Sequence, residues 1–348
     1  MLTMLQIFTI TFPFFALIAA GYAAAWTRML SLDAIPGLNG FVLYFALPCM
    51  LFRFGATTPV AQLLDGSVLL VWGLCALVLV AAVVAASRNG RIGWNDGAFG
   101  ALVAAFPNTG FMGVPLVVAL LGTQAAGPII VTLGFDMVVT SSLCIALSRL
   151  DGADQHGAAR ALKQALRGVL VNPLPWAIAF GTLAAACQWQ PPAPVWNTVS
   201  MLADAASPVA LFTIGAVLAR SAMQVQRSKR EGVAFGDGPA RAEAAAPAGA
   251  LPLYRSLPPV DYLPVVIVKL IGHPLMVWLV GMAVTRAGLP LSPAALMTIV
   301  LVAALPSASN VAMLAERFGA DSGRVARIIL LTTIGAFFTF PLVAAWLR

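Results

Sequence analysis

The stretch "LVAAFPNTGFM" at 102–112 is nearly repeated by "LVAALPSASNVAM" at 301–313, an offset of 199 from Leu102 to Leu301. Each run is apolar up to a proline, Pro107 or Pro306, and then continues with small polar residues. A proline inside a helix removes a backbone donor and clashes with the preceding turn. The repeat therefore predicts two helices that are interrupted at matching positions.

The composition indicates the class of protein. Of the 348 residues, 60% are hydrophobic and 9% are charged, and the mean hydropathy is +0.92. Soluble chains carry about a quarter charged residues, so this chain is predicted to be an integral membrane protein. The net charge of +7 comes from basic residues in short segments between apolar runs, which predicts topology rather than binding to nucleic acid. The four cysteines show neither CxxC nor Cys/His spacing, so neither a disulfide framework nor a zinc site is supported. We expect no metal site and no cofactor.

Apolar runs of about 20 residues predict an all-α polytopic protein with ten transmembrane helices. We place the helices at 5–26, 37–56, 67–87, 97–121, 127–148, 168–188, 205–220, 261–285, 293–315 and 325–347. The seventh run is short, so we expect a thin or broken helix there. The first run carries no charge before Arg28 and lacks the basic start of a signal peptide, so it is expected to be the first helix.

The basic residues predict the orientation. Sixteen of the 20 Lys and Arg residues lie in loops that follow odd-numbered helices. They are Arg28, Arg88, Arg91, Arg149, Arg160, Lys163, Arg167, Arg220, Arg227, Lys229, Arg230, Arg241, Arg255, Arg317, Arg324 and Arg327. Because cytoplasmic loops are enriched in Lys and Arg, we expect these loops in the cytoplasm and both termini outside, in a bacterial inner membrane.

Further matches at an offset of 160 extend the repeat. The segment "ALPCMLFRFGA" (46–56) matches "ASPVALFTIGA" (206–216). In the first helix, Pro13, Ile18, Ala19 and Gly21 fall on Pro173, Ile178, Ala179 and Gly181. The chain is therefore predicted to contain two repeats of five helices each, and an odd number per repeat makes them inverted. Inverted repeats with interrupted helices point to the midplane site of a secondary transporter.

The repeats predict the division of the chain. Residues 1–150 form the first repeat, 151–220 begin the second with helices six and seven, and 259–348 complete it with helices eight to ten. The segment 221–258 is rich in Ala, Gly, Pro and mixed charge, which is typical of a flexible cytoplasmic loop. A plain linker and a regulatory segment both remain open for it.

The two breaks predict a binding site. A break inside the bilayer needs polar partners, and each break leaves a half-helix N-terminus, which carries partial positive charge, at mid-membrane. Two such ends that converge would bind an anion. The predicted substrate-binding residues are Asn108, Thr109, Gly110, Ser307, Ser309 and Asn310. We also expect Gly110 to let the chain turn.

Ionisable residues inside the predicted helices are candidates for a functional role. We expect Asp136 of helix five and Lys269 of helix eight to lie close enough to pair, either as a structural pair or as carriers of coupling charge. His273 lies four residues after Lys269 and therefore on the same helix face. The three residues are candidates for coupling to H⁺ or Na⁺, and transport without a driving ion is a third alternative.

Three further residues are weaker candidates. Arg53, near the outer end of helix two, is expected to extend to the interface. Tyr44 is a candidate cavity wall, and Asp204 a candidate cap of helix seven.

Three motifs resemble one known family: "FPNTGFMGVPL" at 106–116, "KLIGHPL" at 269–275 and "LPSASNVAMLAERFGAD" at 305–321. The chain resembles bacterial members of the auxin efflux carrier family, which are commonly assigned as malate or malonate transporters. The resemblance implies a fold similar to sodium/proton antiporters and bile acid transporters, in which helices four and nine cross at unwound centres. It also implies a scaffold of helices 1, 2, 6 and 7, often dimeric, a moving transport domain of helices 3–5 and 8–10, and a carboxylate beside Asn108 and Asn310.

The sequence thus favours a secondary transporter of small organic anions, mono- or dicarboxylates such as malate, malonate or auxin-like acids, that works by alternating access. A cation/proton antiporter on the same fold is the alternative, although Asp136 is the one acidic residue in the middle of a predicted helix. An intramembrane enzyme is disfavoured, since the chain contains no HExxH motif.

Overall fold

The computed structural model of this protein describes residues 4–59, 65–87, 92–149, 167, 170–171, 173–230 and 258–347. Within these ranges every regular element is a helix, apart from one isolated β-bridge. Seven helical segments are long and apolar enough to cross a membrane, and three shorter apolar ones lie at Thr109–Leu121, Pro173–Ala186 and Pro293–Ala303. The prediction of an all-helical, multi-pass membrane protein is confirmed for the described part of the chain.

The helices follow the hydropathy pattern closely in the first half of the chain. They are α1 (Met4–Trp26), α2 (Ile35–Phe41), α3 (Leu47–Thr57), α5 (Gly66–Ser87), α6 (Trp94–Ala105), α7 (Val114–Leu121), α8 (Ala126–Phe135) and α9 (Ser141–Leu147). In the second half they are α11 (Pro173–Ala186), α12 (Ala193–Arg230), α14 (Leu263–Ile267), α15 (His273–Arg286), α16 (Pro293–Ala303), α17 (Asn310–Arg317) and α18 (Ser322–Trp346).

π-Helical turns widen the helical backbone at four places in the described chain; three of them join consecutive helices, and Thr109–Gly113 begins the half-helix that follows the break at Pro107. These turns are Val42–Ala46, Thr109–Gly113, Asp136–Thr140 and Val268–Gly272. Three of them end two residues before a proline, at Pro48, Pro115 and Pro274. Proline cannot donate to the carbonyl four residues earlier, so the backbone widens locally. The positions of the prolines therefore explain three of the four turns, and Asp136–Thr140 has no such proline.

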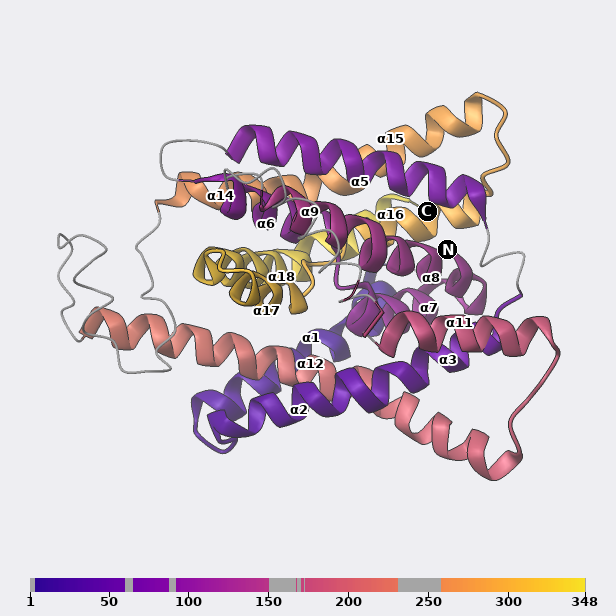
Figure 1. Cartoon of the computed structure of the whole chain (residues 1–348), viewed down its shortest axis with the longest axis horizontal. Helices are drawn as coiled ribbons and strands as arrows, with labels where there is room; N and C mark the ends of the chain where they lie inside the picture. Colours follow the sequence, from indigo (N-terminus) through magenta and orange to yellow (C-terminus); the bar gives the residue numbers. More distant parts are fainter. Residues whose placement is uncertain are drawn as a thin grey trace.

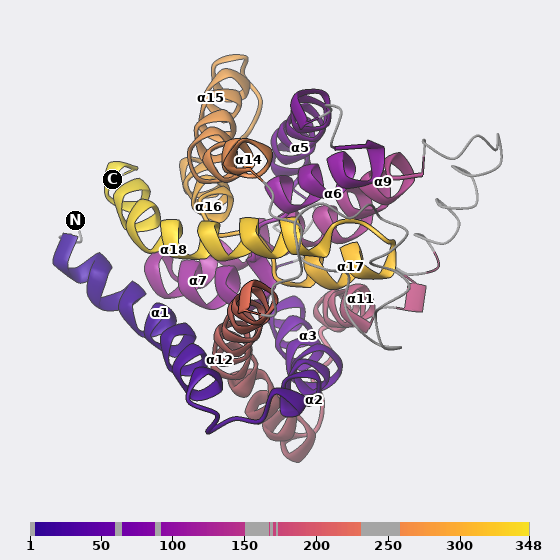
Figure 2. The same ribbon diagram turned by 90° about the vertical axis from the view of Figure 1, so that its left-hand side faces the viewer.

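The helices form two groups. In Figure 1 and Figure 2, α1, α2, α3, α11 and α12 lie on one side of the molecule, and α5, α6, α14, α15 and α16 lie on the other. α1 packs along α12, and α3 packs against both α11 and α12. On the other side, α5 contacts both α6 and α15. α12 also contacts the turn Thr109–Gly113 that follows Pro107, and α1 contacts α7.

Glycines bring the helices of the first group into backbone contact. At each site a glycine faces a carbonyl oxygen of the neighbouring helix; a β-carbon would press into that oxygen at Gly21, Gly181 and Gly215 and would make a tight contact at Gly55. The four contacts are Gly21 with Phe212, Gly181 with Phe52, Gly215 with Ile18, and Gly55 with Ile178. The first two contacts are related by the offset of 160, and so are the last two. The side-by-side packing of α1 with α12 thus has a counterpart in the packing of α11 with α3.

The structure corrects the predicted seventh helix. A thin or broken helix at 205–220 is wrong, because α12 is one helix of 38 residues that contains Pro208. It continues to Arg230, so the first ten residues of the predicted loop at 221–258 are helical. Residues 231–257 lie outside the described residues, and so do the first residues of the predicted second repeat, at 151–166.

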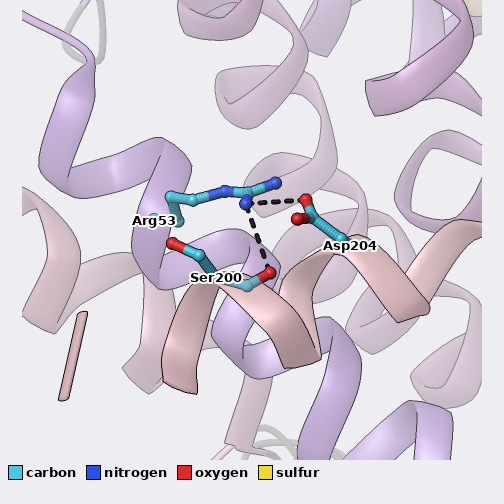
Figure 3. A network of polar contacts seen from close by, with 3 residues as sticks. All are labelled: Arg53, Ser200 and Asp204. Atoms are coloured by element: carbon cyan, nitrogen blue, oxygen red, sulfur yellow. Dashed lines mark hydrogen bonds and ion pairs between the residues drawn. The ribbon is translucent and has the colours of Figure 1, made fainter. Parts of the chain in front are cut away.

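Of the weaker candidates, Asp204 has a different role from the one predicted. Asp204 is not a helix cap, because α12 begins at Ala193. Instead, Arg53 Nη1 donates to Asp204 Oδ1 at 2.8 Å and to the carbonyl oxygen of Ser200 at 3.4 Å (Figure 3). Tyr44 is 60% exposed.

Candidate functional site

The two interrupted helices meet at their breaks. The N–H group of Asn108 donates to the carbonyl oxygen of Pro306 at 2.8 Å, and that of Ala308 donates to Phe106 at 3.0 Å. These two bonds form an antiparallel bridge between Pro107 and Ser307. Each break therefore satisfies backbone groups of the other, which an isolated break inside a bilayer could not do.

The first break follows from its proline. Phe106, which precedes Pro107, is extended, with φ −97° and ψ 100°, as a residue before proline prefers. Helical bonding resumes when the carbonyl of Asn108 accepts from Met112 at 3.1 Å and from Gly113 at 3.0 Å. The Asn108 side chain makes no capping bond to this helix and is 4% exposed. Its amide is therefore buried at the start of a half-helix without serving as the cap.

Gly110 does not have the predicted role of letting the chain turn. The described glycines with positive φ are Gly122, Gly288 and Gly319, and Gly110 is not one of them. A β-carbon on Gly110 would make only ordinary contacts with Leu47 and Leu133, at 3.7 Å and 3.8 Å. Thr109, which is fully buried, bonds the carbonyl of Pro107 through its hydroxyl at 3.5 Å.

The second break contains polar atoms that lack partners. Ser307 Oγ and Asn310 Oδ1 are buried and have no hydrogen-bond partner among the described residues. The backbone N–H of Ser307 donates to Thr332 Oγ1 of α18 at 3.2 Å, while Ser309 is half-buried. Buried polar groups are nearly always paired in proteins, so these two atoms mark a place that a ligand can complete.

A hydroxyl of the first helix group contacts the first break. Ser207 of α12 donates to the carbonyl of Phe111 at 3.4 Å. Phe111 lies four residues before Pro115, which has no backbone N–H to donate to this carbonyl. The bond links α12 directly to the place where the two broken helices bond each other, at residues 106–108 and 306–308, which we call the crossing.

The three ionisable candidates are buried next to α16, the half-helix that ends just before Pro306. Asp136, Lys269 and His273 are each at most 1% exposed. The structure does not join Asp136 and Lys269 directly, since the one ion pair of the described residues is that of Arg53 and Asp204. Lys269 Nζ instead lies 3.1 Å from His273 Nδ1 and 3.1 Å from the carbonyl oxygen of Ala303.

Two residues of this region were missed from the sequence. Trp72 of α5 donates its indole N–H to Asp136 Oδ1 at 3.1 Å, and an aromatic residue in an apolar run gives no signal of such a role. Arg324 was assigned to a cytoplasmic loop but lies in the first turn of α18 and is 1% exposed. It donates to the carbonyls of Asp261 and Asp96, at 2.8 Å and 2.7 Å, and thereby ties α18 to the starts of α6 and α14.

No group of three or more His, Cys, Asp or Glu residues is arranged to hold a metal ion in the part of the chain that the structure describes. What the crossing does offer is two asparagines, a serine hydroxyl and two half-helix N-termini, those at Thr109 and Asn310. Amide N–H groups, hydroxyls and helix N-termini are all donors suited to an anionic oxygen.

A family of known proteins resembles this chain along almost its whole length. The family described as "Membrane transport protein" matches residues 6–344. A protein of Rhizobium meliloti (strain 1021) named "Putative malonate transporter" is 27% identical over 334 residues, which are 95% of this chain and 92% of that protein. Auxin efflux carrier component 4 of Arabidopsis thaliana is 30% identical over 142 residues, which are 40% of this chain and 22% of that protein.

Proposed function

We propose that this protein is a secondary carrier of small organic anions. The premise is that the chain belongs to the membrane transport protein family, which includes the auxin efflux carriers. The substrates are mono- or dicarboxylates, with malonate and malate as first candidates because of the named relative from Rhizobium meliloti. The site lies where the two broken helices cross.

The observation that carries this proposal is the set of polar groups left without partners at the crossing. Ser307 Oγ is buried and unpartnered in the described chain, and its hydroxyl can donate. The Asn108 side chain makes no capping bond to its helix. A carboxylate would accept hydrogen bonds from the Asn108 and Asn310 amides and from the Ser307 hydroxyl. The half-helix N-termini would add favourable electrostatic energy in a region of low dielectric constant.

Alternating access would use the two helix groups. The glycine contacts of α1, α3, α11 and α12 favour a fixed scaffold, while the crossing belongs to the other helices. We propose that the group with the crossing slides or rocks against this scaffold and exposes the site to each side in turn. The scaffold would also form a homodimer, and both termini would lie on the outer side of a bacterial inner membrane.

Uptake into proteoliposomes tests the function. Wild-type protein is reconstituted, and uptake of labelled malonate, malate and an aromatic carboxylate is measured with imposed pH and Na⁺ gradients. We expect saturable uptake of one acid. Asn108→Ala should lower this uptake at least about tenfold, since one charge-assisted hydrogen bond is lost, while the protein remains folded.

A matched control is Asn197→Ala, because Asn197 is exposed near the start of α12. It should transport at the wild-type rate. Normal uptake by a well-folded Asn108→Ala protein would refute the placement of the substrate at Asn108.

A cation/proton antiporter is the second candidate, and one observation favours it. Asn310 Oδ1 and Asp136 Oδ2 are buried acceptor oxygens without partners in the described chain, which a cation or a proton would satisfy. The same vesicles separate the two functions. Flux of Na⁺ or H⁺ with no uptake of any organic acid would put the antiporter first.

A further inference from the structure

A row of buried side chains connects four segments behind the crossing. Trp72 comes from α5, Asp136 and Lys269 from two π-helical turns, and His273 from the start of α15. None of the four is more than 1% exposed. The row ends at the carbonyl of Ala303, three residues before Pro306.

The acid at one end of the row is only partly satisfied. Asp136 Oδ1 accepts from Trp72 Nε1 at 3.1 Å and from Thr140 Oγ1 at 2.8 Å. Asp136 Oδ2 is buried and has no hydrogen-bond partner among the described residues. This oxygen is therefore open to another donor.

The base at the other end of the row is held by two acceptors. When Lys269 is protonated its ammonium group can only donate, so His273 Nδ1 accepts from it and the proton of the neutral ring lies on Nε2. The other acceptor, Ala303, is the last residue of α16, and the carbonyl end of a helix carries partial negative charge. Lys269 thus places a positive charge on the end of a half-helix that leads directly into the crossing.

Trp72 lies between the acid and the base. Its N–H group bonds Asp136, and its ring lies against that of His273, with a centroid distance of 5.3 Å and an interplanar angle of 46°. Opposite charges attract strongly in a buried environment, yet no ion pair joins Asp136 to Lys269 in the described structure. Trp72 thus contacts the acid directly and contacts the ring of His273, which in turn lies against Lys269.

We propose that Trp72 is a positioning residue of the carrier: it holds Asp136 away from Lys269, so that the ammonium group stays on the end of α16, beside the anion site. This inference rests on the proposed function. Lys269 then has two alternative acceptors, Ala303 and Asp136, and Trp72 decides between them. The positive charge near the substrate depends on which acceptor Lys269 takes.

The test is a double-mutant cycle on transport. Trp72→Phe keeps the ring against His273 but removes the N–H group that bonds Asp136. We expect the KM for the transported anion to rise about tenfold, from the loss of one hydrogen bond to a charged group, with a smaller change in maximal rate. In the Asp136→Asn background the neutral side chain does not attract Lys269, so Trp72→Phe should leave KM unchanged.

The control is Trp278→Phe, since Trp278 of α15 packs on Trp346, with a ring centroid distance of 4.9 Å, and has no place in the row. It should leave KM as in the wild type. Thermal unfolding of each variant is measured in parallel, so that a loss of stability is not taken for a loss of affinity.

Two results would overturn the inference. One is an equal rise in KM when Trp72→Phe is made with and without Asp136→Asn. The other is a lower unfolding temperature for Trp72→Phe with an unchanged KM, which would make Trp72 purely structural. Failure of the proposed function has a different signature, because wild-type protein would then take up no organic anion at all.

Discussion

The helices α1, α3, α11 and α12 pack through glycines, whereas the crossing places polar side chains without partners in the protein interior. In the first region each glycine faces a backbone carbonyl of its neighbour, as Gly21 faces Phe212. In the second, Ser307 Oγ and Asn310 Oδ1 are buried without hydrogen bonds to the described residues. Close backbone packing leaves no room for a ligand, while unpaired polar atoms are stabilised by one. The difference separates a region suited to hold its shape from one suited to bind.

The charged residues follow the same division. Among the glycine-packed helices, Arg53 and Asp204 form an ion pair whose Asp204 side chain is 69% exposed. Behind the crossing, Asp136 and Lys269 are fully buried and do not pair with each other. An exposed ion pair contributes little to stability, whereas a buried charge is costly unless its surroundings hold it. The following predictions test this contrast, beginning with the largest expected effect.

Gly21→Ala should be the most damaging substitution. Its β-carbon would press into the carbonyl oxygen of Phe212, and a backbone group cannot rotate away as a side chain can. We expect a loss of about 3 kcal/mol or more in the free energy of unfolding, seen as a lower thermal unfolding temperature and poor yield of purified protein. Gly40→Ala in α2 is the control, because nothing lies within 4 Å of its β-carbon position, and it should unfold as the wild type does or slightly later. Equal stability of the two variants would contradict the glycine-packed scaffold.

Thr332→Val should have an intermediate effect on the crossing. It removes the acceptor of the Ser307 N–H group, and an unsatisfied buried donor costs about 1–3 kcal/mol. We expect both the unfolding temperature and the rate of anion uptake to fall. Thr333→Val is the matched control, since its hydroxyl bonds only Ile329 within its own helix. If both variants transport alike, Thr332 does not support the second break.

Asp204→Asn should have the smallest effect. The ion pair with Arg53 is partly in solvent, and such pairs contribute below about 1 kcal/mol. Arg53 also keeps its bond to the carbonyl of Ser200. We expect an unfolding temperature close to that of the wild type, at low and at high salt. A large, salt-dependent drop in the unfolding temperature would show that this exposed ion pair contributes substantially to stability, against the contrast drawn here between exposed and buried charges.

Hydropathy predicts helices well where packing does not override it. The spans predicted at 5–26 and 67–87 correspond to α1 and α5 within one residue at each end. The seventh prediction failed because Asp204 and Pro208 lower the apolar signal within a continuous helix. Asp204 is tolerated since Arg53 of a neighbouring helix pairs with it, and a proline is tolerated in a membrane helix when neighbours re-satisfy the backbone. A local window of sequence shows neither Arg53 beside Asp204 nor the helices that pack around Pro208.

The candidate site could be predicted only in part, because contacts between distant segments are not visible in the sequence. The resemblance to the auxin efflux carrier family, based on three motifs, is confirmed by the family match over residues 6–344. Which acceptor Lys269 would choose was not predictable, because His273 is four residues away in sequence but Ala303 is 34 residues away. Trp72 was not predictable either, since its bond to Asp136 spans 64 residues.

The sequence by itself determined that the chain is an apolar, helical membrane protein, because composition and hydropathy decide which segments can lie in lipid. It also determined where helical bonding fails, because proline has no backbone donor in any context. Only the tertiary structure decided that the breaks at Pro107 and Pro306 bond each other and that Trp72 stands between Asp136 and His273. Those contacts join residues far apart in the chain, and only the packing of whole helices brings such residues within a few ångströms.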